Sequence, residues 1–324
     1  MTVHTVPRWK DDLLQNYQIR KTAAQKTAFI GHLAEIYGGR MHVEESGKFI
    51  KNRNIVIGNP DTASVIYGAH YDTCARLPFP NFITPKNFVI FLLYQIFVGL
   101  IMIAPVLILS FPFAALLVRL DLPEGTTILL SELFLFAGMI AVLLLMTAGP
   151  ANKHTANDNT SGVVTVLTLA DRLAGRKDVC FVLFDNEESG LFGSAAFAKQ
   201  HKNARDHTLV VNFDCVSDGD WILFLSSRSI CRKTASHEEF REAVRRLCAT
   251  TDKLPLFASS MAAIYPSDQM NFKKTIAVAS LNKSRNPLIG YYMNRIHTPK
   301  DTVFDENNIA LLTDLFADID HSAL

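Results

Sequence analysis

Two long uncharged segments near the middle of the chain constrain its fold more than any other feature. No Asp, Glu, Lys or Arg occurs in residues 87–118 or 133–152. A transmembrane helix needs about 20 predominantly apolar residues, so each segment is long enough to cross a bilayer. The connection, residues 119–127, contains charged residues, proline and glycine, which are typical of a polar turn. The pattern predicts a transmembrane helical hairpin over residues 87–150.

Pro105 and Pro112 interrupt the first apolar segment. A re-entrant hairpin at the membrane interface and an apolar arm buried in a homo-oligomer are the alternatives.

Because a hairpin returns to the side that it leaves, the chain before and after it should lie on one side of the membrane. The N-terminal residues carry charges and no apolar leader, so no signal peptide is expected. With Lys86 and Lys153 beside the hairpin, the positive-inside tendency predicts an integral protein of the cell membrane whose remaining chain is cytoplasmic.

Outside the hairpin, residues 1–86 and 151–324 have the pattern of one discontinuous domain. Short apolar runs predict strands at residues 54–58, 64–69, 179–184, 208–213, 221–225 and 276–281. Periodic apolar residues predict helices at residues 8–37, 161–173, 190–200, 237–249 and 307–319. Strands that alternate with helices predict an α/β fold with a largely parallel central sheet flanked by helices.

Charge and cysteine content argue against two classes of function. The formal net charge is +1, whereas a nucleic-acid partner usually needs a basic face, so none is expected. The five cysteines include no CxxC pair, and their odd number fits no complete disulfide framework. Cys180 and Cys215 lie in apolar runs and are expected to be buried free thiols.

Histidines and carboxylates gather in a few short motifs on both sides of the hairpin. The motifs are GAHYDT at 68–73, NDNTSG at 157–162, DNEESG at 185–190, NFD at 212–214 and IHTPKDT at 296–302. Together they supply two histidines and enough carboxylates to hold two divalent metal ions with an open coordination position. That is the composition of a hydrolytic two-metal centre.

Three of these motifs fall at the ends of predicted strands. His70 ends one strand, residues 185–188 follow another, and Asp214 ends a third. In open α/β sheets, ligands bind outside the carboxyl ends of the strands, so these side chains are expected in one site.

Each motif also has an ordinary structural explanation. Residues 157–159 could form a turn or cap the next helix, and Glu187 with Glu188 could complement the positive end of a helix. His70 and His297 could be ordinary structural or loop residues. The joint occurrence of all the motifs in one order favours a single site.

The order of the motifs resembles that of the M28 family of zinc peptidases, which includes aminopeptidases with two co-catalytic zinc ions. The resemblance covers about residues 20–73 and 155–321. It implies that His70 and Asp214 hold one zinc ion. It implies that Glu188 and His297 hold the other, and that Asp158 bridges the two.

The same resemblance implies two supporting roles. Asp72 would orient His70, because metal-bound imidazoles usually donate to a carboxylate or carbonyl. Glu187 would be the general base, since a carboxylate that is not a ligand must accept a proton and deliver it to the leaving amine. One departure is visible: the family often reads Ser-Asp-His where this chain reads Ser267-Asp268-Gln269. Tyr265, just upstream, could donate a hydrogen bond to the tetrahedral intermediate.

The resemblance implies a membrane-anchored zinc aminopeptidase that removes N-terminal residues from peptides with a water activated by two metals. Its partners would be peptide substrates and the lipid bilayer, and the protein could also form a homo-oligomer. The alternatives are a glutaminyl cyclase-like enzyme with one zinc and a catalytically inactive membrane receptor or scaffold. His70 together with Asp214 favours two metals, and the presence of Glu187 favours an active enzyme.

The insertion that contains the hairpin begins just after Asp72 and ends just before Asp158. Both roots of the hairpin should therefore lie within a few residues of the chemistry. Phe79 and Phe82, between three prolines in residues 74–85, are expected either to line the pocket or to pack the hairpin onto the domain.

Overall fold

The computed structural model describes residues 5–232 and 234–318. The strands are β1 Met41–Ser46, β2 Asn52–Ile57, β3 Val65–His70, β4 Val179–Phe184, β5 Leu209–Phe213, β6 Trp221–Ser226, β7 Leu254–Ser259, β8 Thr275–Lys283 and β9 Tyr291–Tyr292. They form one sheet in the order β1-β2-β4-β3-β5-β8-β6-β7, and β9 pairs with β8. The central strands β4, β3, β5 and β8 run parallel, which confirms the predicted α/β class.

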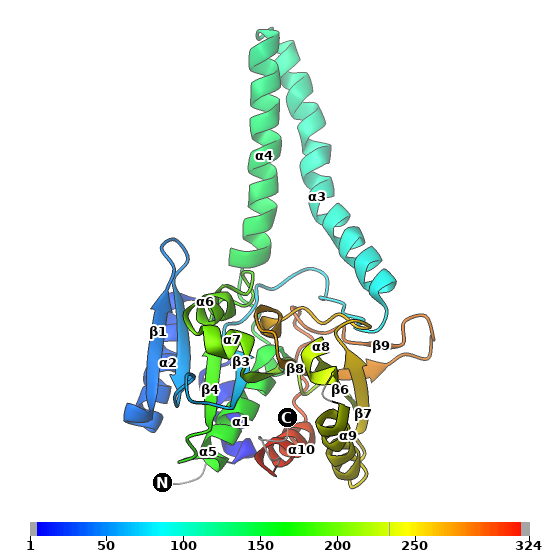
Figure 1. Ribbon diagram of the computed structural model, residues 1–324. Coiled ribbons are helices and arrows are strands. Elements are labelled where there is room, and N and C mark those ends of the chain that lie inside the picture. The colour runs from blue at the N-terminus through cyan, green and yellow to red at the C-terminus, as the bar shows by residue number, and fades with distance from the viewer. Residues whose placement is uncertain (1–4, 233, 319–324) are drawn as a thin grey trace.

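Helices cover both faces of this sheet and extend beyond it (Figure 1). They are α1 Val6–Asn16, α2 Ala23–Tyr37, α3 Phe88–Arg119, α4 Glu124–Ala148, α5 Gly162–Arg172, α6 Phe192–Gln200, α7 Lys202–Asp206, α8 Arg228–Cys231, α9 Thr234–Cys248 and α10 Glu306–Asp318. Short helical turns occur at Gly38–Arg40, Ala156–Ser161 and Asp268–Asn271.

Alternate residues of the strands pack into two different apolar clusters. Tyr67 of β3 belongs to the cluster that also contains residues of α1, α2, α5 and α10. Its neighbour Ile66 belongs to the cluster that contains Phe197 of α6 and Ala204 of α7. Because both faces are covered, β3, β4 and β5 are buried along their whole length, as parallel strands generally are.

The single helix expected over residues 8–37 is wrong, because two helices occur there. Thr22 starts the second helix with a capping box: Gln25 N donates to Thr22 Oγ1 at 3.3 Å, and Thr22 N donates to Gln25 Oε1 at 2.9 Å. The connection between the helices carries Arg20, which is fully buried. Its Nε donates to the carbonyl oxygen of Tyr71 at 2.6 Å, so the break in the helix anchors the chain beside β3.

Helices α3 and α4 form a hairpin that extends away from the sheet (Figure 1). Both are long and apolar enough to cross a membrane, and only 11% and 0% of their most apolar windows are buried. At 1.5 Å per residue their lengths are about 48 and 38 Å, from 32 and 25 residues. Both exceed the roughly 30 Å of a hydrocarbon core. Pro105 and Pro112 lie inside α3, which continues through both of them.

The chain that enters the hairpin is joined to the chain that leaves it. Arg76 N donates to the carbonyl oxygen of Pro150 at 2.8 Å, and Asn152 N donates to that of Cys74 at 3.1 Å. Farther along the hairpin, the rings of Phe113 and Phe134 stack with centroids 4.4 Å apart. The two helices therefore start from a fixed base on the domain.

Candidate metal centre

The sequence motifs meet at the carboxyl end of the parallel strands. His70 is the last residue of β3, Glu187 and Glu188 follow β4, and Asp214 follows β5. These strands are neighbours in the sheet, so backbone pairing alone brings their ends together. Asp158 lies in the helical turn before α5.

The carboxylate of Asp158 lies between the two histidines. Its Oδ1 is 3.3 Å from His70 Nε2, and its Oδ2 is 3.1 Å from His297 Nε2. His70 Nε2 is also 3.6 Å from Asp214 Oδ1, and His297 Nε2 is 3.3 Å from Glu188 Oε2. The structure thus brings together all five residues for which the sequence suggested a ligand role, and each oxygen of Asp158 faces a different group.

Two groups of potential ligand atoms share Asp158. The first consists of His70, Asp158 and Asp214, and the second consists of Cys74, Asp158, Glu188 and His297. Within each group the ligand atoms all lie within 4.8 Å of one another. The sequence alone indicates no role for Cys74, because the residue lies outside the family motif and no spacing rule marks it.

Asp72 supports the site mainly through the backbone. Its Oδ1 accepts from Glu187 N at 3.0 Å, and its Oδ2 accepts from Glu188 N at 3.2 Å. His70 Nδ1 lies 3.6 Å from the Asp72 carboxylate and 3.1 Å from the Asp72 carbonyl oxygen. Asp72 therefore fixes both the Glu187–Glu188 turn and the His70 ring.

Asp301 supports the turn that carries Asp158. Its two carboxylate oxygens accept from Asn157 N at 2.8 Å and from Asp158 N at 3.0 Å, and its side chain is buried. Asp301 belongs to the last motif, but nothing in the sequence indicates that it reaches across to residues 157 and 158.

The electrostatics of the site reflect many carboxylates in a buried space. Burial raises the pKa of Glu187 and of Glu188 well above the usual range, although His70 opposes the shift. Burial acts to raise the pKa of Asp158 too, but hydrogen bonds from His297 and His70 lower it overall. Such a cluster is costly without cations to compensate it.

The donor set fits zinc. Imidazole nitrogens and carboxylate oxygens are ordinary zinc ligands, and Glu188 Oε1 is buried without a hydrogen-bond partner among the described residues. An oxygen of that kind, beside His297, has the position of a metal ligand whose partner is an ion.

A pocket of about 240 Å³ opens onto these groups. Asn81 and Ile83, from the segment that leads into α3, line it together with Glu187 and Tyr265. The Tyr265 hydroxyl donates to the carbonyl oxygen of Asp214 at 3.1 Å, so this contact positions the Asp214 backbone.

Of the two phenylalanines in the entering segment, Phe82 packs the hairpin onto the domain. Its ring centroid lies 5.1 Å from that of Tyr94 in α3 and 5.9 Å from that of Tyr292 in β9. Phe79 and Phe82 are both absent from the described residues that line the metal pocket. The root of the hairpin contributes to the rim through Asn81 and Ile83.

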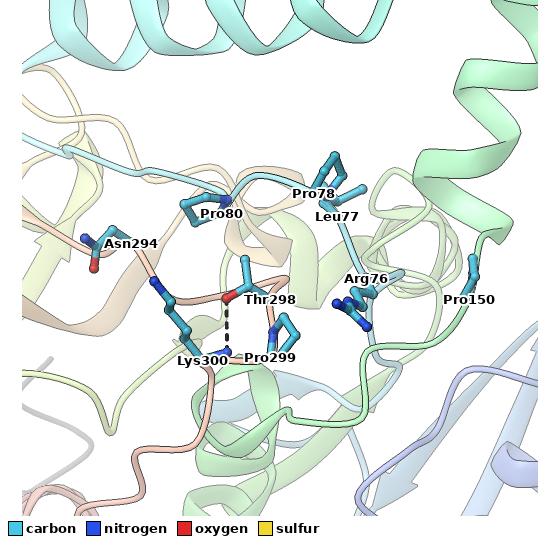
Figure 2. A pocket seen from close by; sticks show the side chains of 9 residues that line it. All are labelled: Arg76, Leu77, Pro78, Pro80, Pro150, Asn294, Thr298, Pro299 and Lys300. Carbon is cyan, nitrogen blue, oxygen red and sulfur yellow. Dashed lines mark hydrogen bonds between the residues drawn. The ribbon is translucent and has the colours of Figure 1, made fainter.

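A second pocket, of about 610 Å³, lies at the roots of the hairpin (Figure 2). Leu77, Pro78, Pro80, Pro150 and Pro299 give it a stiff, largely apolar wall. Figure 2 shows the side chains of Arg76 and Lys300 at this pocket, near the end of α4 and on the loop after His297 respectively. Both side chains belong to exposed residues.

Solved structures with the same fold include zinc exopeptidases and glutaminyl cyclases. The chain is similar to a Zn-dependent exopeptidase from Parabacteroides distasonis, with 15% identity, a TM-score of 0.56, and 97% and 96% of the two chains covered. It is similar to a glutaminyl cyclase from Porphyromonas gingivalis, with 14% identity, a TM-score of 0.54, and 98% and 97% covered. It is also similar to the LapA aminopeptidase of Legionella pneumophila, with 13% identity and a TM-score of 0.50. The match covers 96% of this chain and 68% of the LapA chain.

No curated protein sequence matches the chain. The model of peptidase family M28 matches residues 144–318, which is more than half of the chain and contains Asp158, Glu187, Glu188, Asp214 and His297. Because this model matches more than half of the chain, the chain belongs to peptidase family M28.

Proposed function

We propose that this protein is a membrane-anchored zinc aminopeptidase that removes N-terminal residues from peptides. The observation that carries the proposal is the position of Asp158, whose two oxygens face two separate groups of ligands. A carboxylate in this position can bridge two cations. In the proposed centre, His70 and Asp214 hold one zinc ion, and Glu188 and His297 hold the other.

Bound zinc would polarise the scissile carbonyl and lower the pKa of the attacking water. The chain itself must then move a proton from the water to the leaving amine. Glu187 lines the pocket, and its backbone is fixed by Asp72. Glu187 is therefore the proposed general base.

The test is a metal count and a turnover assay on purified protein in detergent, with a panel of aminoacyl reporter peptides. Wild-type protein should hold two zinc ions per chain and release N-terminal residues. Glu187→Gln should keep both ions and lose about 10²–10⁴-fold in turnover, as expected for a general base. Asp158→Ala should lose metal. Glu45→Gln, at an exposed position of β1, is the matched control and should behave as wild type.

Two results would replace this proposal. One zinc ion per chain with cyclisation of N-terminal glutamine, and no release of amino acids, would make the protein a glutaminyl cyclase. Two bound ions with turnover of neither substrate class would make it a receptor or scaffold on the same fold.

The membrane part of the proposal is that residues 87–150 embed the protein in the cell membrane, with residues 1–86 and 151–324 as one cytoplasmic catalytic domain. The exposed apolar surfaces of α3 and α4 support it. Arg76 and Lys300 also support it, because at the roots of the hairpin they would lie at the level of lipid phosphates (Figure 2).

Carbonate-washed membranes should retain the full chain, and deletion of residues 87–150 should release it. Recovery of the full chain in the soluble fraction would contradict membrane insertion. Digestion of the domain by protease added outside intact cells would reverse the orientation.

A further inference from the structure

We propose that Cys74 is a fourth protein ligand of the zinc ion that Glu188 and His297 hold, an inference that rests on the proposed metal centre. Cys74 would make the two metal positions different: one closed by protein ligands and one open. Cys74 lies outside residues 144–318, which the family model matches.

The first argument is geometric. Cys74 Sγ lies within 4.8 Å of a ligand atom from Asp158, Glu188 and His297, and those atoms lie equally close to one another. Glu188 Oε1, in the same group, is buried without a hydrogen-bond partner among the described residues. The Glu188 side chain is only 10% exposed. An unpartnered carboxylate oxygen beside a thiol and an imidazole is the donor set of a zinc site.

The second argument is that the backbone holds Cys74 in place. The residue is 1% exposed, and its carbonyl oxygen accepts from Asn152 N at 3.1 Å. The next residue, Ala75, forms an antiparallel bridge with Ala151. The chain that enters the hairpin is therefore clamped to the chain that leaves it at the point where the thiol faces the metal groups.

A second buried cysteine, Cys215, lines the metal pocket on the His70 side. Cys215 Sγ donates a hydrogen bond to Asp214 Oδ1 at 3.0 Å, and Cys215 belongs to none of the ligand groups found among the described residues. Cys215 is buried to the same degree as Cys74. Because Cys215 contacts a proposed ligand, the matched control is Cys180 of β4, a fully buried thiol that belongs to none of the ligand groups found among the described residues.

Ligand counts give the chemical consequence. The group around His70 has three protein ligands, which leaves a tetrahedral zinc ion one open position, whereas four protein ligands close the tetrahedron. With Cys74 bound, the open position would lie on the His70 side. A further group of potential ligand atoms joins Glu187 to His70 and Glu188, so the proposed base is near that side.

A thiolate ligand also changes which metals the site accepts. Soft thiolates favour zinc, and sites made only of carboxylate, carbonyl and water suit magnesium or manganese. Binding of Cys74 as a thiolate releases the thiol proton to the solvent, as metal binding to cysteine generally does. Manganese should therefore replace the ion at the His70 position more readily than the ion at the Cys74 position.

The test uses full-length protein in detergent, loaded with zinc or with cobalt. X-ray absorption at the zinc edge should show a sulfur neighbour at about 2.3 Å. The cobalt form should show a sulfur-to-cobalt charge-transfer band in the near ultraviolet. Cys74→Ser should lose both signals. It should also lower the affinity for one of the two zinc ions by at least roughly 10–100-fold, the loss that follows when a metal ligand loses its hydrogen-bond partner. Cys180→Ser should keep both signals.

Absence of a sulfur neighbour in wild-type protein that holds two zinc ions would overturn the inference without any variant, as would an unchanged cobalt band in Cys74→Ser. The spectra also separate this inference from the proposed function. A sulfur signal with a single bound ion would leave Cys74 as a ligand and refute the two-metal centre. Two bound ions without a sulfur neighbour would support the two-metal centre and refute Cys74 as a ligand.

Discussion

Asp72→Asn tests whether metal binding depends on the hydrogen bonds between the Asp72 carboxylate and the backbone of the Glu187–Glu188 turn. The substitution keeps the size of the side chain and removes its charge. In the native protein the two carboxylate oxygens accept from Glu187 N and Glu188 N. An asparagine has only one acceptor oxygen, so its amide group would face one of these N–H donors and leave it without a partner in a buried site.

The magnitude follows from that lost contact. A hydrogen bond to a charged group contributes about 1.5–3 kcal/mol. Loss of a carboxylate that orients metal ligands typically costs about 10–100-fold in metal affinity, which is about 1.4–2.7 kcal/mol at 1.36 kcal/mol per factor of ten. We therefore expect zinc binding to weaken by about 1.4–2.7 kcal/mol, and the metal-free protein to lose about 1.5–3 kcal/mol of stability through the lost hydrogen bond.

The assay is a competition titration of zinc against a chelator, combined with urea unfolding of the metal-free protein. Asp171→Asn is the matched control. Its carboxylate accepts from Trp9 Nε1 at 2.9 Å and from Tyr37 Oη at 3.2 Å, away from the site. The control should lose stability and keep its zinc affinity. If Asp72→Asn binds zinc as tightly as wild type, the positioning role of Asp72 is wrong.

Three further predictions concern other parts of the molecule. Burial raises the pKa of Asp268 to about 7, whereas an unfolded aspartate titrates near 3.9. Metal-free protein should therefore lose stability as the pH rises from about 4 to 7. Asp268→Asn should reduce that dependence in unfolding titrations, and Glu187 and Glu188, whose pKa values burial also raises, should maintain the remainder. Thr22→Ala removes the capping box and should lower the free energy of unfolding by about 1 kcal/mol in urea. A Cβ on Gly138 would lie 2.4 Å from Val106 Cγ1, and one on Gly99 would meet nothing within 4 Å. Gly138→Leu should therefore lower thermal stability in detergent, by about 1–3 kcal/mol of overpacking, and Gly99→Leu should not.

The parts of the fold that were predictable are those with a strong local signal. The apolar run of β4 was predicted at its observed bounds, Val179–Phe184, because a strand buried on both faces must be apolar throughout. The edge strands β1 and β7 were missed. β1 is only half-buried and reads MHVEES, so it has no run of apolar residues.

The helix boundary between α1 and α2 was missed for a different reason. Apolar residues keep a helical spacing on both sides of residues 17–22, so periodicity alone cannot show the break. The signal that was present, Thr22 followed by Gln25 at the capping-box spacing, acts through hydrogen bonds of the backbone and not through hydrophobicity.

The sequence by itself determined which residues could form a metal centre and that a pair of spanning-length apolar segments interrupts the domain. Both conclusions depend on side-chain chemistry and run length, which are local properties. Only the tertiary structure decided that Asp158 lies between two ligand groups, that Asp301 supports its turn, and that Cys74 faces Glu188 and His297. These contacts join segments separated by the hairpin or by more than a hundred residues. Their geometry is set by strand order and by the clamp at the hairpin roots, and no spacing along the chain encodes it.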